Sequence, residues 1–287
     1  MRGLTAIILV LSCQTAFAEN PASIQIKGSD TMVNLGQAWA EVFMTEHPST
    51  QIAVTGGGSG TGLAALANGT ADIAQSSRSM NEKERELIQS KGQSVAEIET
   101  AIDALTVVVR PDNPVKELTL DQLSSIFSGR VTNWSQVGGK NQAILVLSRE
   151  RNSGTHVYFL EEVVRHGNPK GPEEFAPNVL MMSSSQAIVQ EVADNPAAIG
   201  YFGLGYLTPH VKALALSKSG GPFVSPSVQT ALDKSYSLSR PLYFYLPKKP
   251  EGMIKEFVDF VLSERGQAIV LEMDFVPLHE ANVRTDH

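Results

Sequence analysis

The amino-acid sequence predicts an α/β fold with mainly parallel strands. Short apolar segments of strand length alternate with segments whose apolar residues recur at helical spacing, which is typical of layered α/β proteins. Hydrophobic residues make up 42% and charged residues 18% of the 287 positions, so the chain can bury a sizeable core. Several predicted strands also end in Ser, Thr and Gly residues that open the next helix.

The first 18 residues are predicted to be a cleaved signal peptide. Arg2 gives a short positive start, residues 4–11 form an apolar run, and Ala16-Phe17-Ala18 fits a signal-peptidase site. The run is shorter than the about 20 apolar residues that span a bilayer. Lipid attachment at Cys13 is an alternative that Leu11 fits poorly, and a buried N-terminal strand is another. We therefore expect an exported, soluble, periplasmic protein.

The rest of the chain is predicted to alternate strands and helices almost to its end. Thr119 and Gln122 form a capping-box pattern that opens one of these helices. Strands are expected over residues 24–27, 51–55, 72–75, 104–110, 143–148, 199–202, 211–216 and 242–246. Helices are expected over residues 35–43, 63–66, 81–90, 120–127, 157–164, 186–194, 254–262 and 266–271.

Composition excludes several classes of function. The net charge of −7 provides no general positive field for nucleic acid or an anionic membrane. A single Cys excludes disulfide frameworks, CxxC centres and cysteine-based zinc sites. The six His residues are scattered and form no HExxH motif. We therefore expect no cofactor and no metal.

Three strand-to-helix turns suggest a binding site for a small anion. They lie at residues 29–31, 59–62 and 153–155, and each combines hydroxyl side chains with a helix N-terminus, where free N–H groups attract anions. Arg149 and Arg78 lie beside these turns and would supply positive charge, Arg149 as a two-pronged donor. The simpler alternative is that each turn only caps its own helix.

Other catalytic or nucleotide-binding motifs do not fit the same residues. The glycine-rich segment 56–62 has no Lys after its last Gly, and no register of it gives G-x-G-x-x-G. Ser59 lacks the final Gly of G-x-S-x-G. His156 follows Ser153 closely, but without a nucleophile elbow we expect it on a helix surface or at the rim of a site.

Four segments also carry a family resemblance, and they stand in the family's order along the chain. They are Gly28-Ser29-Asp30-Thr31, Gly56-Gly57-Gly58-Ser59-Gly60-Thr61-Gly62, Ala71-Asp72-Ile73-Ala74-Gln75-Ser76-Ser77-Arg78 and Arg149-Glu150-Arg151-Asn152-Ser153-Gly154-Thr155. Shorter matches support them at residues 127–129, 133–134, 199–206 and 239–243. From about Ile24 to Leu278 the chain resembles the PstS family, the phosphate-binding proteins of bacterial phosphate ABC transporters.

This resemblance implies a periplasmic-binding-protein fold of the type II kind, with two α/β lobes, two crossover strands and a ligand cleft between the lobes. The crossings would fall near residues 104–107 and 235–239. Residues 19–104 and 238–287 would then form lobe 1, and residues 105–237 lobe 2. Ligand binding would close the lobes by a hinge motion.

The resemblance also implies which residues contact the anion. The matching positions are Thr31, Met32, Ser59, Arg149, Ser153, Gly154 and Thr155, with Ser29, Asp30, Ser77 and Arg78 beside them. Some members of the family have an acceptor Asp where this chain has Ser77. Phosphate at pH 7 carries a proton that sulfate lacks, so Asp30 or Glu150 would have to accept it, and we expect Asp30.

The sequence thus predicts a non-enzymatic protein that binds inorganic phosphate in the periplasm and delivers it to an inner-membrane ABC permease and ATPase. We expect a monomer that binds no nucleic acid. A first alternative is a binding protein for sulfate, molybdate or tungstate. A second is a phosphatase-like hydrolase, although no metal cluster or activated nucleophile supports it. A third is an adhesin or structural module that has lost the ligand, which the intact Arg149 and Ser153–Thr155 turn argue against.

Overall fold

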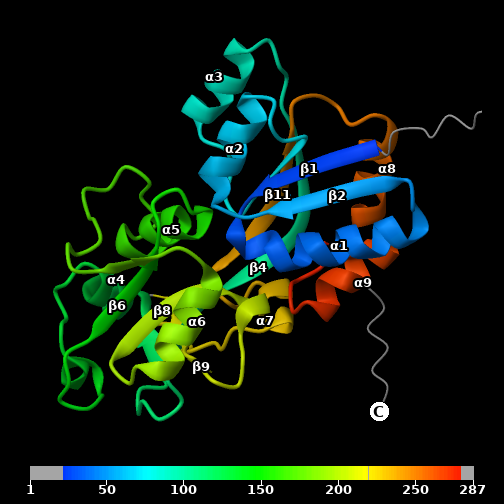
Figure 1. Ribbon diagram of the computed structural model, residues 1–287. Coiled ribbons are helices and arrows are strands. Elements are labelled where there is room, and N and C mark those ends of the chain that lie inside the picture. The colour runs from blue at the N-terminus through cyan, green and yellow to red at the C-terminus, as the bar shows by residue number, and fades with distance from the viewer. Residues whose placement is uncertain (1–21, 219, 279–287) are drawn as a thin grey trace, which may run out of the picture.

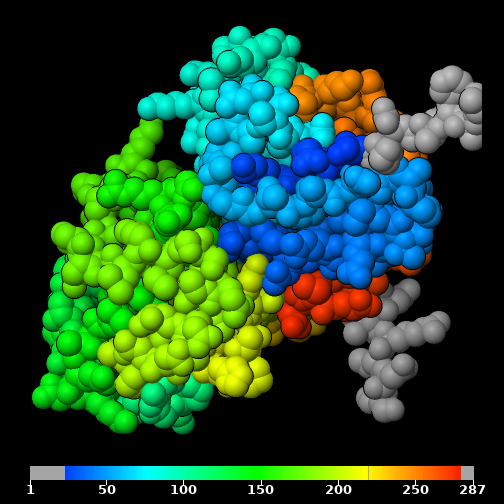
Figure 2. All heavy atoms as spheres, in the orientation of Figure 1, coloured from blue at the N-terminus to red at the C-terminus, as the bar shows by residue number. Residues whose placement is uncertain are grey.

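The computed structural model describes residues 22–218 and 220–278. The predicted signal peptide and Cys13 lie outside these residues. Within them, helices and strands form two α/β lobes that lie side by side in Figure 1. Figure 2 shows the green and yellow second lobe packed against the blue and cyan part of the first. No helix of the described part of the chain is long and apolar enough to cross a membrane.

One curled sheet runs through both lobes. Over the described residues it has nine strands. In spatial order these are β2 (Thr50–Thr55), β1 (Ala22–Gly28), β3 (Ile73–Ser76), β11 (Ser239–Leu246), β4 (Ala96–Val109), β8 (Ala198–Gly203), β6 (Leu145–Arg149) and β7 (Leu180–Met182), with β9 (Lys212–Ala213) paired to β4. A separate parallel pair joins β5 (Glu117–Thr119) to β10 (Ala215–Ser217).

The strand directions differ from the expectation of a mainly parallel sheet. The outer strands are parallel, since β1 pairs with β2 and β3, and β6 pairs with β7 and β8. The middle is antiparallel, because β11 pairs with β3 and β4, and β4 with β8 and β9. The sheet is therefore mixed, with its antiparallel part where the two lobes meet.

Helices cover both halves of this sheet. In the first lobe they are α1 (Val33–Glu46), α2 (Ser59–Ala67), α3 (Glu82–Ser90), α8 (Gly252–Leu262) and α9 (Glu264–Glu272). In the second they are α4 (Leu120–Phe127), α5 (Gly154–Phe159), α6 (Ser185–Asp194) and α7 (Val228–Leu232), and a π-helical turn at Leu160–Val164 extends α5. The capping box that opens α4 is confirmed, because Thr119 Oγ1 accepts from the Gln122 N–H at 3.1 Å.

The long strand β4 joins the two hydrophobic cores. Its residues 96–104 pair with β11, and its residues 105–109 pair with β8. Trp39 and Phe244 belong to the core of the first lobe, whereas Val107 and Tyr201 belong to that of the second. The chain returns just before β11, because Leu238 packs in the second core and Leu242 in the first. On this basis we propose lobe boundaries near residues 104/105 and, on the return, between Leu238 and Leu242, slightly after the 237/238 boundary expected from the sequence.

Several elements were not predicted from the sequence. The first half of β4 carries Glu97, Glu99 and Asp103, and acidic residues are depleted in strands, so only the apolar second half was expected. The strands β5 and β7 and the helix α7 have five residues or fewer and give little periodic signal. The single strand expected over residues 211–216 is two short strands, β9 and β10, with different partners.

Close packing of α2 on β1 depends on Gly62. A Cβ at this position would lie 2.4 Å from the Lys27 carbonyl oxygen and 2.6 Å from Gly28 Cα, and both are backbone atoms. We expect Gly62→Ala to lower the free energy of unfolding by about 1–3 kcal/mol, the usual cost of overpacking. Gly60→Ala in the same helix is the control, because its Cβ would come no closer than 3.4 Å to a neighbour. Equal urea-unfolding midpoints for the two variants would contradict this account.

Candidate anion-binding site

The first predicted turn follows β1 and brings its hydroxyls into the interior. Ser29 and Thr31 are each about 1% exposed, and the Ser29 side chain does not cap the helix that follows. The Ser29 hydroxyl instead donates to Ser77 Oγ at 2.9 Å. The Met32 side chain is buried in the first core, and its N–H donates to the Ser29 carbonyl at 3.1 Å.

The second turn places Ser59 against Ser77, the residue that the Ser29 hydroxyl also contacts. Gly58 is the N-cap of α2, and Ser59 Oγ accepts from the Ser77 N–H at 3.1 Å. The two hydroxyl oxygens of Ser59 and Ser77 are 3.5 Å apart. Ser29, Ser59 and Ser77 thus form one buried hydroxyl cluster, and Ser59 is not a helix cap.

The third turn belongs to the second lobe and meets the first two. The Thr155 and Thr31 hydroxyl oxygens are 2.8 Å apart, although 124 residues separate them in the chain. A Cβ on Gly154 would lie 2.4 Å from Ser59 Oγ, so a glycine is needed for this approach. Ser153 does act as a cap, because its Oγ accepts from the Thr155 N–H at 3.2 Å. The three turns therefore converge between the lobes.

Arg149 is the buried cation of this region. It is 1% exposed at the end of β6. Its nitrogens donate to the carbonyls of Met182 (3.2 Å) and Ser183 (2.9 Å) and to the Ser185 hydroxyl (3.0 Å). Its Nη1 also lies 3.2 Å from Asp30 Oδ2 across the lobe interface. Burial lowers the pKa of Arg149, and the neighbouring Asp30 carboxylate opposes that effect.

Asp30 faces the second lobe and does not cap its own helix. Its Oδ2 accepts from the Ser185 N–H at 2.8 Å, and its carbonyl accepts from the Tyr206 hydroxyl at 2.8 Å. Glu150, the other acid proposed from the sequence, is exposed. Asp30 is therefore the carboxylate that lies within the converging turns.

Arg78 has a different environment from the one expected. Its Nη1 donates to Glu84 Oε2 at 2.8 Å and its Nη2 donates to Glu84 Oε1 at 2.6 Å. Glu84 is also part of the capping box at the start of α3. This ion pair satisfies the charge of Arg78 within the first lobe. Arg78 thus lies beside the hydroxyl cluster, but its positive charge is already paired.

Two buried charged residues were missed from the sequence. Arg240 on β11 is 2% exposed and pairs with Asp103 on β4, which is 0% exposed. Arg240 Nη2 also donates to Thr155 Oγ1 at 2.9 Å. An acidic residue next to the apolar half of β4 and an arginine in the otherwise uncharged β11 were a usable signal, but only the pairing of β4 with β11 brings the two together.

Contacts between the lobes also involve the backbone. Asn152, in the loop before α5, donates from Nδ2 to the Gly57 carbonyl at 2.7 Å and to Thr61 Oγ1 at 3.1 Å. Its own carbonyl accepts from the Gly60 N–H at 3.0 Å. The glycine-rich loop of the first lobe is thus joined directly to the second lobe, and the described lobes are in a closed arrangement.

His156 is not on a surface or at a rim, contrary to the expectation from the sequence. It is 5% exposed, its Nδ1 lies 3.1 Å from Ser148 Oγ, and its ring packs near Phe175. Ser148 Oγ also lies 2.6 Å from the Tyr201 hydroxyl. The expectation was wrong because Ser148 of β6 and the Phe175 ring pack against the imidazole.

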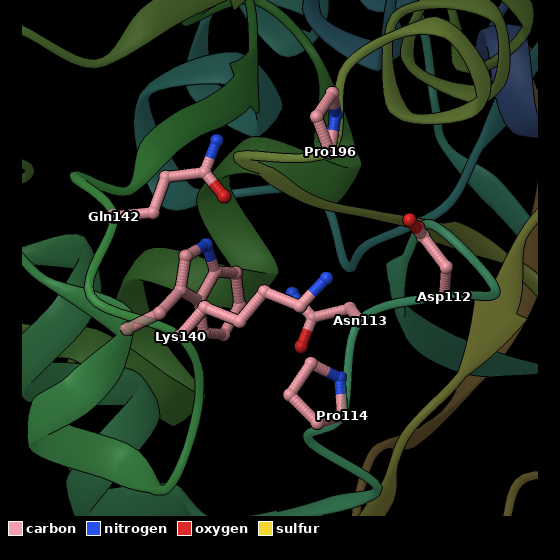
Figure 3. A pocket seen from close by; sticks show the side chains of 7 residues that line it. Asp112, Asn113, Pro114, Lys140, Gln142 and Pro196 are labelled. Atoms are coloured by element: carbon pink, nitrogen blue, oxygen red, sulfur yellow. The ribbon is translucent and has the colours of Figure 1, made fainter.

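A metal-binding cluster and a small hollow in the second lobe are the alternatives to a site at the three turns, and neither fits. The described residues contain no group of three His, Cys, Asp or Glu side chains placed to hold a metal ion. The hollow has a volume of about 10 Å³, room for one water at most. Figure 3 shows the side chains that line it. The hollow is lined by Asp112, Asn113, Pro114, Trp134, Lys140, Gln142 and Pro196. None of these residues belongs to the three turns.

A two-lobed α/β chain with buried hydrogen-bond donors between its lobes has the architecture of a periplasmic binding protein, and residues 15–265 match the family model of a PBP superfamily domain. The phosphate-binding protein PstS of Pseudomonas aeruginosa is 36% identical over 88% of this chain and 81% of its own. PstS of Bacillus subtilis is 34% identical over 92% and 83%. The chain therefore belongs to the PstS family.

Solved structures agree with this assignment. A candidate phosphate ABC transporter substrate-binding protein from Clostridium perfringens, solved with bound phosphate, is 33% identical with a TM-score of 0.80. The alignment covers 90% of this chain and all of that one. An ABC-type phosphate transport receptor from Vibrio cholerae is 32% identical with a TM-score of 0.71, over 89% of this chain and all of that one. The predicted two-lobed fold is confirmed.

The buried His156 makes stability depend on pH. Burial lowers its pKa to about 4, below the ordinary value of 6.5 that it regains on unfolding. The unfolded chain therefore binds the proton more readily, and stability falls as the pH drops from about 6.5 towards 4. We expect this group to cost about 2 kcal/mol of unfolding free energy between pH 7.5 and 5.

His156→Asn keeps an amide that can hydrogen-bond in place of Nδ1 but does not titrate, so urea unfolding at the two pH values should show a smaller acid loss than in the wild type. His210→Asn, at an exposed histidine, is the control and should keep the wild-type acid loss. An unchanged acid loss in His156→Asn would assign the effect to other groups.

Proposed function

We propose that this chain is a non-enzymatic substrate-binding protein that binds inorganic phosphate between its lobes. In this proposal the mature, exported protein delivers the anion to an ABC permease and its ATPase in the inner membrane. Membership of the PstS family and the phosphate-bound relative from Clostridium perfringens support the ligand. The monomeric state and the periplasmic location are parts of the same proposal.

The observation that carries the proposal is the convergence of buried donors from both lobes. Thr31 and Ser59 from the first lobe and Thr155 from the second are each 1% exposed or less. Hydroxyl and N–H donors stabilise a buried anion without bringing a counter-charge that must itself be desolvated. Arg149 adds a positive charge beside Asp30 of the first turn. This suits a small oxyanion with oxygens in several directions.

Entry of the ligand requires the lobes to separate. The Thr31–Thr155 contact and the bonds of Asn152 to the glycine-rich loop would break, while β4 and β11 keep the lobes joined. Hinge closure around a ligand is the usual motion of such two-lobed proteins. On closing, the hydroxyls would donate to the anion instead of contacting one another.

Selection of phosphate over sulfate is assigned to Asp30. Phosphate retains a proton at pH 7, and a carboxylate can accept it, whereas it would repel the fully ionised sulfate. Asp30 is the acid that reaches the interface between the turns, and its partners Arg149 and Ser185 hold it there.

The ligand is tested by calorimetry on the purified mature chain. We expect binding of phosphate, with sulfate, molybdate and tungstate weaker or absent, and no turnover of p-nitrophenyl phosphate with or without added metal. Arg149→Ala should weaken phosphate binding by about 2–5 kcal/mol, because it leaves the buried anion without its cation. Arg149→Lys should recover only part of this, since an ammonium cannot replace the planar fork.

Arg85→Ala is the matched control, because it removes a half-buried arginine of the first lobe whose Nη2 lies 3.2 Å from Glu97 Oε2. Near-native phosphate affinity in Arg149→Ala would refute the placement of the site. If the wild type prefers another oxyanion, phosphate is not its ligand, but the placement of the site is unaffected.

Asp30→Asn tests the basis of specificity. An amide cannot act as the charged acceptor, so phosphate binding should weaken while sulfate binding stays the same or improves. Competition calorimetry with the two anions measures the change in preference, and Glu150→Gln, at an exposed position, is the control. An unchanged phosphate-to-sulfate preference in Asp30→Asn would remove Asp30 from this role.

A further inference from the structure

Two buried charges lie on the strands that connect the lobes. Asp103 of β4 and Arg240 of β11 are register partners in the antiparallel pair, next to the point where β4 changes its partner from β11 to β8. Both side chains are at least 98% buried. Neither belongs to the three turns, yet both touch groups that the turns present.

Asp103 holds the Arg240 guanidinium in a fixed orientation. Its Oδ2 accepts from Arg240 Nε at 3.1 Å and from Nη2 at 2.8 Å, and its Oδ1 accepts from the Leu204 N–H at 3.1 Å. The guanidinium also lies 5.3 Å from the centre of the Tyr158 ring. These contacts fix the direction of Nη2.

Arg240 Nη2 points at the two threonines that meet between the lobes. It donates to Thr155 Oγ1 at 2.9 Å and lies 3.5 Å from Thr31 Oγ1. Arg240 Nη1 is buried and has no hydrogen-bond partner among the described residues. The cation at the base of the interlobe region is thus in direct contact with hydroxyls from both lobes.

The cost of burying this pair argues for a role beyond stability. Desolvating two charges commonly offsets their attraction, and well-packed apolar residues often replace such a pair without loss of stability. A carboxylate and a guanidinium on the connecting strands therefore need another explanation, and the contact with Thr155 provides one.

Arginine has only donors, so Thr155 Oγ1 must accept the hydrogen bond from Arg240. One of the two lone pairs of Thr155 Oγ1 is then occupied, and its proton and second lone pair remain for other partners. In the closed lobes the Thr155 hydroxyl lies next to Thr31 Oγ1. When an anion is bound, its partner would instead be an oxygen of that anion. Because Arg240 occupies part of the acceptor capacity of Thr155, the contact favours donation by this hydroxyl to the ligand over acceptance.

We propose that Arg240, held by Asp103, is a positioning residue that fixes Thr155, and with it Thr31, as hydrogen-bond donors to the bound anion. This inference rests on the proposed function, because it concerns the same interlobe site. It separates two tasks in that site: the threonines donate, and Asp30 alone accepts.

A double-mutant cycle tests the inference. The neutral pair Asp103→Asn/Arg240→Gln removes both charges together, so neither is left buried alone, and it is made in the wild-type and the Thr155→Val backgrounds. Inorganic phosphate is titrated calorimetrically into all four proteins. We expect the neutral pair to weaken binding at least about tenfold in the wild type, the scale of one hydrogen bond to a charged group. In the Thr155→Val background we expect no more than about twofold.

Equal losses in the two backgrounds would overturn the inference, because a structural effect of the charged pair would not depend on Thr155. Thermal unfolding verifies that each variant is folded, and Arg240→Lys, which keeps a cation opposite Asp103, replaces the neutral pair in the cycle if that pair does not fold. Arg85→Gln is the control for losing an arginine elsewhere. Absence of phosphate binding by the wild type would overturn the proposed function and this inference together, whereas binding with equal losses overturns the inference alone.

Discussion

The antiparallel pairing of β11 with β4 is the constraint on which the rest of the structure depends. It joins two hydrophobic cores through one sheet, because β4 leaves β11 after Ala104 and continues as the partner of β8. The turns after β1 and β6 can therefore face each other, although one belongs to each lobe. The contact between Thr31 and Thr155 is a consequence of this arrangement. The same two strands carry Asp103 and Arg240, so the connection between the lobes is also the base of the site.

A chain with a net charge of −7 can hold an anion because the relevant charges are local and balanced. Asp30 lies against Arg149 and Asp103 against Arg240, and between these pairs lie neutral hydroxyl donors. The field of the whole molecule governs approach from a distance and is screened within about 10 Å at moderate salt. In the proposed site, hydrogen bonds would act at contact distance, where the desolvated hydroxyls, the guanidinium groups and Asp30 would determine which ligand fits.

Local sequence signals predicted secondary structure well, but they predicted the surroundings of individual side chains less well. The capping box at Thr119 predicted a helix start that depends only on neighbouring residues, and the structure has it. Arg78 and His156 were judged by their neighbours in sequence alone. Glu84, six residues after Arg78, neutralises that arginine, and Phe175 and Ser148 lie around His156 in a buried position. A side chain's charge state and exposure are set by whatever packs on it, and that information is distributed over the whole chain.

By itself the sequence determined the α/β class, most of the helices and strands, and the three hydroxyl-bearing turns, because apolar periodicity and turn residues act over a few positions. The family resemblance added the two-lobed architecture. Only the tertiary structure decided that Ser153 caps a helix while Ser59 bonds to Ser77, since both serines stand in the same Ser-Gly-Thr sequence. It also decided that Asp30, rather than Glu150, reaches across the interface, and that Arg240 meets Thr155. These contacts join residues 85 to 155 positions apart, and their geometry follows from strand pairing that no local pattern specifies.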